Sequence, residues 1–123
     1  MNILLVDDER NELDKVYQAT KNVYPNANIT TYDDEKMALE YLKENAPDII
    51  VLDIILKEEH GYAMCHKITK IYPEVIVILL TSSLNAIDTY MAERCGAKAF
   101  AIKTADMESY KEILEKEISQ MVT

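Results

Sequence analysis

The chain has 123 residues, of which 49% are hydrophobic and 28% charged, as expected for one globular domain. Its formal net charge of −9 leaves no basic stripe for nucleic acid and disfavours an anionic membrane surface. The longest apolar run, Val75 to Leu80, is far shorter than the roughly 20 residues of a membrane span, and the first residues lack the pattern of a signal peptide. Cys65 and Cys95 are too few for a disulfide framework, so we expect reduced thiols and a cytoplasmic protein.

The first third of the chain predicts two strands and two helices. Residues 3–6 are a continuous apolar run, typical of a strand that is buried on both faces. A helix follows and ends before Pro25, with a buried stripe of Leu13, Val16, Tyr17 and Thr20. The alternating residues 27–32 predict a second strand. Asp33 and Asp34 can then cap a helix that ends near Pro47, with a buried stripe of Ala38, Tyr41 and Leu42.

The middle of the chain repeats this alternation. Residues 49–52 predict a third strand, and Asp53 follows it directly. Gly61 begins the next helix, which ends at Pro73 and places Cys65, Ile68 and Tyr72 on one face. Residues 75–80 predict a fourth strand that is buried on both faces.

The last third adds two helices and a strand. A serine after Thr81 can cap a helix that contains Ile87, Tyr90 and Met91 and ends at Gly96 in the left-handed conformation. Residues 99–102 predict the fifth strand. Asp106 is the expected cap of the last helix, whose core face contains Tyr110, Ile113, Leu114, Ile118 and Met121. The order is (βα)5, and right-handed crossovers then predict a five-stranded parallel sheet with helices on both faces.

Polar residues follow four of the five predicted strands. They are Asp7 and Asp8, Asp53, Thr81 and Ser82, and Lys103. In an open parallel sheet, ligands bind beyond the carboxyl ends of the strands, so we expect these side chains to converge. Clustered carboxylates repel each other unless they hold a cation, and Mg²⁺ prefers such hard oxygen ligands. We therefore expect Asp7, Asp8 and Asp53, with the backbone carbonyl of Ile55, to bind Mg²⁺.

An aspartate beside Mg²⁺ is also a competent nucleophile toward phosphorus, and it would form an aspartyl phosphate. The ammonium of Lys103 and the hydroxyl of Thr81 would stabilise the phosphoryl oxygens. Each residue also has an ordinary structural explanation. The paired aspartates and Thr81-Ser82 can cap helices, Lys103 can be a solvated lysine, and Phe100 can be a core aromatic.

The pattern Leu5-Val6-Asp7-Asp8-Glu9, Leu52-Asp53 with Gly61 eight residues on, Thr81-Ser82 and Lys103 resembles the receiver domain of two-component response regulators. The resemblance covers essentially the whole chain, residues 1–123, and implies the flavodoxin-like fold with strand order 2-1-3-4-5. It implies that Asp53 accepts a phosphoryl group from a sensor histidine kinase or a phosphotransfer protein. Asp7 and Asp8 would form the Mg²⁺ pocket, and Lys103 would contact the phosphoryl group.

The resemblance further implies a switch, in which Thr81 moves toward the phosphoryl group and Phe100 follows it. The domain would then be a signalling phosphoacceptor that assists its own phosphorylation and dephosphorylation, and not an enzyme with a separate substrate. The surface made by the fourth helix, the fifth strand and the fifth helix would change. An output domain after this chain and a phosphorylation-dependent homodimer are both compatible with this interpretation, whereas direct binding of nucleic acid or membrane is not expected.

Three positions depart from the family pattern, and other hypotheses stay open. Lys57 and Thr104 stand where the family usually has proline, and Phe100 replaces the common tyrosine. The first alternative is a pseudo-receiver, a protein-binding module that signals without phosphorylation. The second is a small α/β enzyme. A flavodoxin is disfavoured by the acidic loop after the first strand, and an aspartyl-nucleophile phosphatase by Ile55, where a second acid is usual.

Overall fold

The structure of the chain is a computed structural model that describes residues 1–56, 61–82 and 88–121. Its strands are β1 (Asn2–Val6), β2 (Asn28–Tyr32), β3 (Ile49–Asp53), β4 (Ile76–Thr81) and β5 (Ala99–Ile102). Its helices are α1 (Arg10–Val23), α2 (Glu35–Glu44), α3 (Gly61–Ile71), α4 (Thr89–Arg94), α5 (Glu108–Glu112), a π-helical segment (Ile113–Ile118) and α6 (Ser119–Met121).

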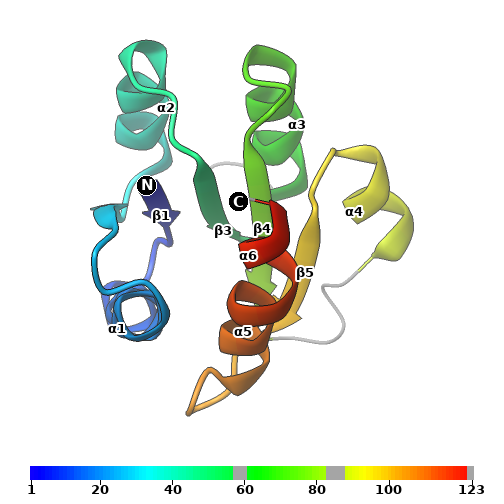
Figure 1. Cartoon of the computed structure of the whole chain (residues 1–123). Coiled ribbons are helices and arrows are strands. Elements are labelled where there is room, and N and C mark those ends of the chain that lie inside the picture. The colour runs from blue at the N-terminus through cyan, green and yellow to red at the C-terminus, as the bar shows by residue number, and fades with distance from the viewer. Residues whose placement is uncertain (57–60, 83–87, 122–123) are drawn as a thin grey trace.

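The strands form one parallel sheet in the order β2-β1-β3-β4-β5, as the sequence predicts (Figure 1). The apolar runs in β1, β3 and β4 place buried side chains on both faces of the sheet. Helices α1 and α5 cover one face, and α2 and α3 cover the other (Figure 1). The prediction of a flavodoxin-like architecture with helices on both faces is confirmed.

Each face of the sheet has its own hydrophobic core. The first core joins α2 and α3 to alternate strand residues, and its strand members are Leu4, Val6, Ile50, Leu52, Val77 and Leu79. The second core joins α1 and α5 to the remaining strand residues, namely Ile3, Leu5, Ile49, Val51, Ile76, Ile78 and Leu80. This alternation follows from the two-residue period of a strand. Cys65 and Cys95 are free thiols buried in the first core.

Two predicted helix starts differ from the observed ones. In the described part of the chain, α4 begins after Asp88, whose carboxylate accepts a hydrogen bond from the N–H of Met91 at 3.2 Å. The predicted cap, a serine after Thr81, falls in part on residues 83–87, which lie outside the described residues. Asp88 has the required side chain directly before the first helical residue. Tyr90 and Met91 are exposed, by 62% and 43%, and the predicted Ile87 lies outside the described residues.

The start of α5 also differs from the prediction. Met107 occupies the N-cap position in the left-handed conformation, with φ of 55°. Asp106 precedes it, but its carboxylate still accepts a hydrogen bond from the N–H of Glu108 at 3.1 Å. The predicted core residues Tyr110, Leu114 and Ile118 are buried, Ile113 is half-buried, and nothing is described of the Met121 side chain.

None of the helices in the described ranges has the length and apolar composition that crossing a bilayer requires.

Gly96 adopts a φ of 93° at the end of α4, as predicted for a left-handed terminal residue.

Candidate functional site

The sheet brings residues that are far apart in sequence to its carboxyl edge. Asp7 follows β1, and its N–H donates to the carbonyl of Tyr32 at the end of β2. Asp53 is the last residue of β3 and pairs with β4. The N–H of Lys103 donates to the carbonyl of Thr81 at 2.7 Å, which extends the β4–β5 pairing by one bond. The parallel ladders therefore fix the backbone of every strand-end residue in this group.

Lys103 lies between the two aspartates. Its Nζ is 2.8 Å from Asp7 Oδ2 and 2.6 Å from Asp53 Oδ2, distances of charge-assisted hydrogen bonds. Its side chain is 3% exposed, whereas that of Asp53 is 12% exposed. A third carboxylate, that of Glu12, lies 3.7 Å from the same nitrogen. The site thus combines a buried ammonium with a surplus of negative charge.

The second oxygen of each aspartate is held by the backbone. Asp7 Oδ1 accepts from the N–H of Glu9 at 2.9 Å, and Asp53 Oδ1 accepts from the N–H of Ile55 at 2.8 Å. Each carboxylate is therefore oriented at both oxygens, by Lys103 on one side and by the following turn on the other. Such double anchoring holds a reactive group in one position before a ligand arrives.

The ionisable groups respond to this arrangement. Burial raises the pKa of Asp7, and the hydrogen bonds from Lys103 and from the Glu9 N–H offset that effect in part. Burial alone would lower the pKa of Lys103, but the hydrogen bonds to Asp53 and Asp7 outweigh it, so the pKa is raised. The two carboxylates thus stabilise the positive charge of Lys103, whereas burial opposes the negative charge of Asp7.

Gly61 presses against the backbone beside Asp53. Its N–H donates to the carbonyl of Ile54 at 2.6 Å. A Cβ atom at this position would lie 2.3 Å from the carbonyl oxygen of Asp53 and 2.8 Å from the Cα of Ile54. Only glycine allows α3 to begin this close to the end of β3.

The other predicted site residues have different degrees of exposure. Thr81 is 1% exposed at the end of β4, and Asp8 is half-buried beside Asp7. The Ile55 side chain is 56% exposed, which leaves its backbone as the part that faces Asp53. Phe100 is 37% exposed on β5, so its explanation as an ordinary core aromatic is wrong.

Two of the three departures from the family pattern fall within the described residues, and Lys57 lies outside them. No peptide bond in the described ranges is cis, so Lys103 and Thr104 are joined in trans. The trans bond still places the Lys103 ammonium between Asp7 and Asp53.

One residue near the site was missed at the level of sequence. Glu12 lies in the first turn of α1, where an acid is explained by the helix dipole alone. Its carboxylate pairs with Lys15 at 3.5 Å and also faces Lys103. The available signal was its position one helical turn after Asp8, at the edge on which the predicted site lies.

The chemistry of these donors suits Mg²⁺. Asp7 and Asp53 contribute two carboxylates that share one ammonium, and Asp8 adds a third acid at the same edge. Burial raises the pKa of Asp7 by disfavouring its charged form, and a bound cation would favour that form. Within the described residues, no group of three or more His, Cys, Asp or Glu side chains is gathered closely enough to hold a metal ion unaided. Mg²⁺ does not require such a group, because it keeps several waters and uses few protein carboxylates.

A family model described as "Response regulator receiver domain" matches residues 3–115. The chain therefore belongs to the receiver domains of two-component response regulators, signalling domains of the class that its sheet edge suggests.

Similar proteins include the probable transcriptional regulatory protein TcrX of Mycobacterium tuberculosis, 30% identical over 88% of this chain and 45% of that protein. The sensory transduction protein LytT of Enterococcus faecalis is 28% identical over 98% of this chain and 49% of its own length. This chain thus spans about half the length of these curated relatives.

Solved structures agree with the fold. The signal receiver domain of a DNA-binding response regulator from Colwellia psychrerythraea 34H has a TM-score of 0.83 and 26% identity, over 99% of this chain and 98% of that one. The BeF3-activated receiver domain of DrrB has a TM-score of 0.77 and 27% identity, over 98% and 96%.

Proposed function

We propose that residues 1–123 form a receiver domain in which Asp53 is the phosphoacceptor. The observation that carries this proposal is the contact of 2.6 Å between Asp53 Oδ2 and the buried ammonium of Lys103. In the reaction, a carboxylate oxygen of Asp53 bonds to the phosphorus of a phosphohistidine, and the phosphorus–nitrogen bond breaks. The imidazole leaves and takes up a proton, and Asp53 becomes an aspartyl phosphate.

Each neighbouring group has a role in this proposal. Lys103 neutralises the charge on the phosphoryl oxygens, and Asp7 keeps that ammonium in place. The N–H of Ile55 fixes Oδ1 of Asp53, so that Oδ2, the oxygen beside Lys103, is the one that reacts. Asp7, Asp8, Asp53 and the backbone carbonyl of Ile55 would hold Mg²⁺, which when bound draws negative charge from the phosphoryl oxygens.

We further propose a switch at Thr81 and Phe100. The new phosphoryl oxygens attract the Thr81 hydroxyl from the end of β4, and Phe100 on β5 moves inward from its exposed position. The surface of α4, β5 and α5 then shifts between two states that already exist in equilibrium. Tyr90 and Met91 on α4 are exposed beside this surface and would report the change.

The partners follow from this chemistry. A sensor histidine kinase or a phosphotransfer protein donates the phosphoryl group, and a cytoplasmic location provides access to both. Because the curated relatives are about twice as long, an output domain after this chain is part of the proposal. A phosphorylation-dependent homodimer is proposed in addition, through the surface that the switch changes. Direct contact of this domain with nucleic acid is not part of the proposal, because a net charge of −9 is repelled by the phosphate backbone.

A second candidate function is that of a pseudo-receiver, which binds its partner without phosphorylation. One observation favours it: both oxygens of Asp53 are already engaged, by Lys103 and by the Ile55 N–H. In that case the ion pair between Asp53 and Lys103 would stabilise the fold and would take no part in a reaction.

The test is phosphorylation with acetyl phosphate and Mg²⁺, measured by intact mass. We expect the mass to increase by one phosphoryl group, and to stay unchanged in Asp53→Asn or with a chelator. Lys103→Met should slow the reaction by about 100-fold, the usual effect of removing one charge-stabilising group. If the wild-type chain takes up no phosphoryl group and no BeF3⁻ in the presence of Mg²⁺, the pseudo-receiver is correct.

A further inference from the structure

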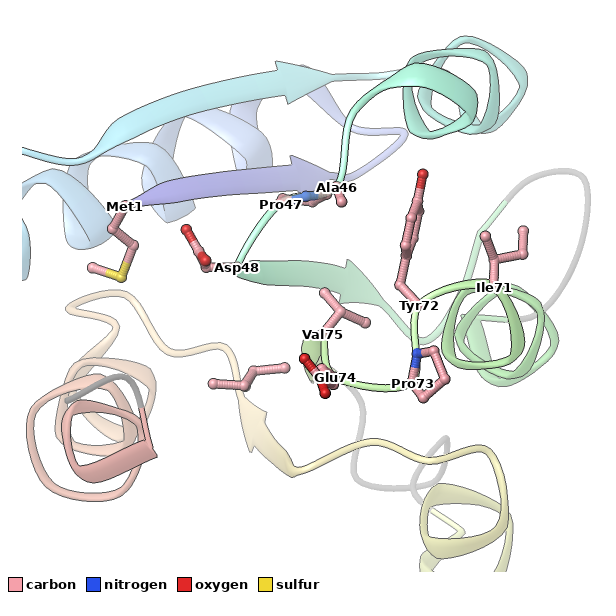
Figure 2. Close-up of a pocket in the computed structure, with 10 residues that line it drawn as sticks. Met1, Ala46, Pro47, Asp48, Ile71, Tyr72, Pro73, Glu74 and Val75 are labelled. Atoms are coloured by element: carbon pink, nitrogen blue, oxygen red, sulfur yellow. The ribbon is translucent and has the colours of Figure 1, made fainter.

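A hollow of about 850 Å³ lies at the amino ends of the strands, at the opposite edge of the sheet from Asp53. Figure 2 shows Met1 and Asp48 on one side of it, where β1 and β3 begin. The segment from Ile71 to Val75, which leaves α3 and leads into β4, lies on the other side. A hollow of this volume is large enough for a small organic molecule.

The hollow is lined by apolar and polar groups together. Among its apolar residues, Met1 and Ile71 are exposed by 41% and 62%, whereas Val75 and Ile76 are buried in the fold, with exposures of 4% and 7%. Tyr72 forms a further wall and is held by a hydrogen bond from its hydroxyl to the carbonyl of Leu42 on α2. Exposed apolar side chains around a concave surface lose unfavourable contact with water when a ligand covers them.

The charged side chains that line the hollow are all acidic in the described part of the chain. The residues that line it include two carboxylates, Asp48 and Glu74, but none of the described lining residues is Lys, Arg or His. Asp48 accepts a hydrogen bond from the N–H of Asn2 at 2.8 Å. Glu74 is exposed, and within the described residues it has no base as partner. The described lining therefore carries two carboxylates and no basic side chain that would offset their charge.

We propose that this hollow is a binding site for a small organic cation with an apolar body. The body packs on Met1 and Ile71, and the ammonium or guanidinium lies against Glu74. An anion with the same body is repelled by both carboxylates. The site is independent of the phosphoacceptor function, because no residue is shared between the two edges of the sheet.

The test uses three probes with the same phenyl body: 2-phenylethylamine, neutral 2-phenylethanol and anionic 3-phenylpropanoate. Each is titrated into the isotope-labelled chain, and amide shifts are followed by NMR. We expect saturable shifts at Asp48, Ile71, Glu74 and Val75 with the amine. The amine should bind about tenfold more tightly than the alcohol, and the acid should bind more weakly than either.

Variants assign the two halves of the site. Glu74→Gln should bring the affinity for the amine down to that for the alcohol, whereas Ile71→Ala should weaken both. Glu93→Gln, an exposed acid on α4, should change neither. All three side chains are exposed, so the folded amide spectrum should persist. The proposal is overturned if the amine gives no saturable shift, if the acid binds as well as the amine, if Glu74→Gln has no effect, or if the shifts lie near Asp53.

Discussion

At the scale of single residues, the closeness of two backbones makes Gly61 irreplaceable. We predict that Gly61→Ala costs at least about 2 kcal/mol of unfolding free energy, because its Cβ would lie 2.3 Å from the Asp53 carbonyl oxygen and backbone would have to move. Denaturant unfolding monitored by circular dichroism measures the loss. The control is Ala63→Gly, an exposed change in the same helix that should cost about 1 kcal/mol through helix propensity alone. Equal losses in the two variants would contradict the close approach.

Tyr110 gives a prediction for alkaline pH. Its side chain is fully buried, its hydroxyl is 2.7 Å from Thr20 Oγ1, and burial raises its pKa. Unfolded tyrosine loses its proton near pH 10, whereas the folded state keeps it, so the folded state binds more protons and stability falls as pH rises above 10. In Tyr110→Phe, the unfolding free energy should decrease less steeply above pH 10. At pH 7 the same variant should lose about 1 kcal/mol with its hydrogen bond.

Urea unfolding between pH 8 and pH 11 measures the effect. Tyr90→Phe is the matched control, because Tyr90 is 62% exposed and should keep the wild-type pH dependence. If Tyr110→Phe lost as much unfolding free energy at alkaline pH as the wild type, a group other than Tyr110 would be responsible.

At the scale of elements, α2 illustrates how a helix start contributes to stability. Asp34 Oδ1 accepts from the N–H groups of Lys36 at 2.8 Å and Met37 at 3.1 Å, which are among the unpaired donors of the first turn. We predict that Asp34→Ala lowers the unfolding free energy by about 1 kcal/mol. Asp33→Ala removes the adjacent acid, which forms an exposed ion pair with Arg10, and should cost less than about 0.5 kcal/mol. Thermal unfolding of both variants measures the two losses of unfolding free energy. Equal losses would contradict the role of Asp34 as the cap of α2.

The same scale shows what the sequence could predict. The strands were predictable because runs such as Ile49–Leu52 are apolar at every position, which a two-faced buried strand requires. The meeting of Asp7, Asp53 and Lys103 followed from parallel order, since all three stand at carboxyl ends. The individual hydrogen bonds of these three residues could not be predicted, because such bonds depend on the backbone conformation of the turn after each strand.

The helix ends were harder to predict, for a physical reason. Serine and aspartate are both good caps, so the sequence alone did not single out Asp88, which caps α4 in the described part of the chain. The π-helical segment Ile113–Ile118 was also unpredictable. It contains the carbonyl of Leu114, which accepts a hydrogen bond from the Tyr24 hydroxyl at 2.7 Å, and that contact comes from the other end of the sequence.

At the scale of the whole molecule, the interior strand β4 joins the two cores. Leu79 belongs to the core under α2 and α3, Ile78 belongs to the core under α1 and α5, and both are fully buried. We predict that Leu79→Ala and Ile78→Ala each cost about 3 kcal/mol, the usual loss for a truncated core side chain. Because one strand carries both side chains, neither core can unfold without removing the other's support. Each variant should therefore unfold in a single transition, with the denaturant slope of the wild type.

Guanidinium unfolding followed by circular dichroism and by tyrosine fluorescence checks this expectation, and the two signals should coincide. Two separate transitions in either variant would mean that the faces of the sheet are independent. Coupling between the faces matters for signalling, because β4 ends at Thr81 and pairs with β5, which carries Phe100. A sheet that transmits stability from one core to the other can also transmit a change at its carboxyl edge to helices on both faces.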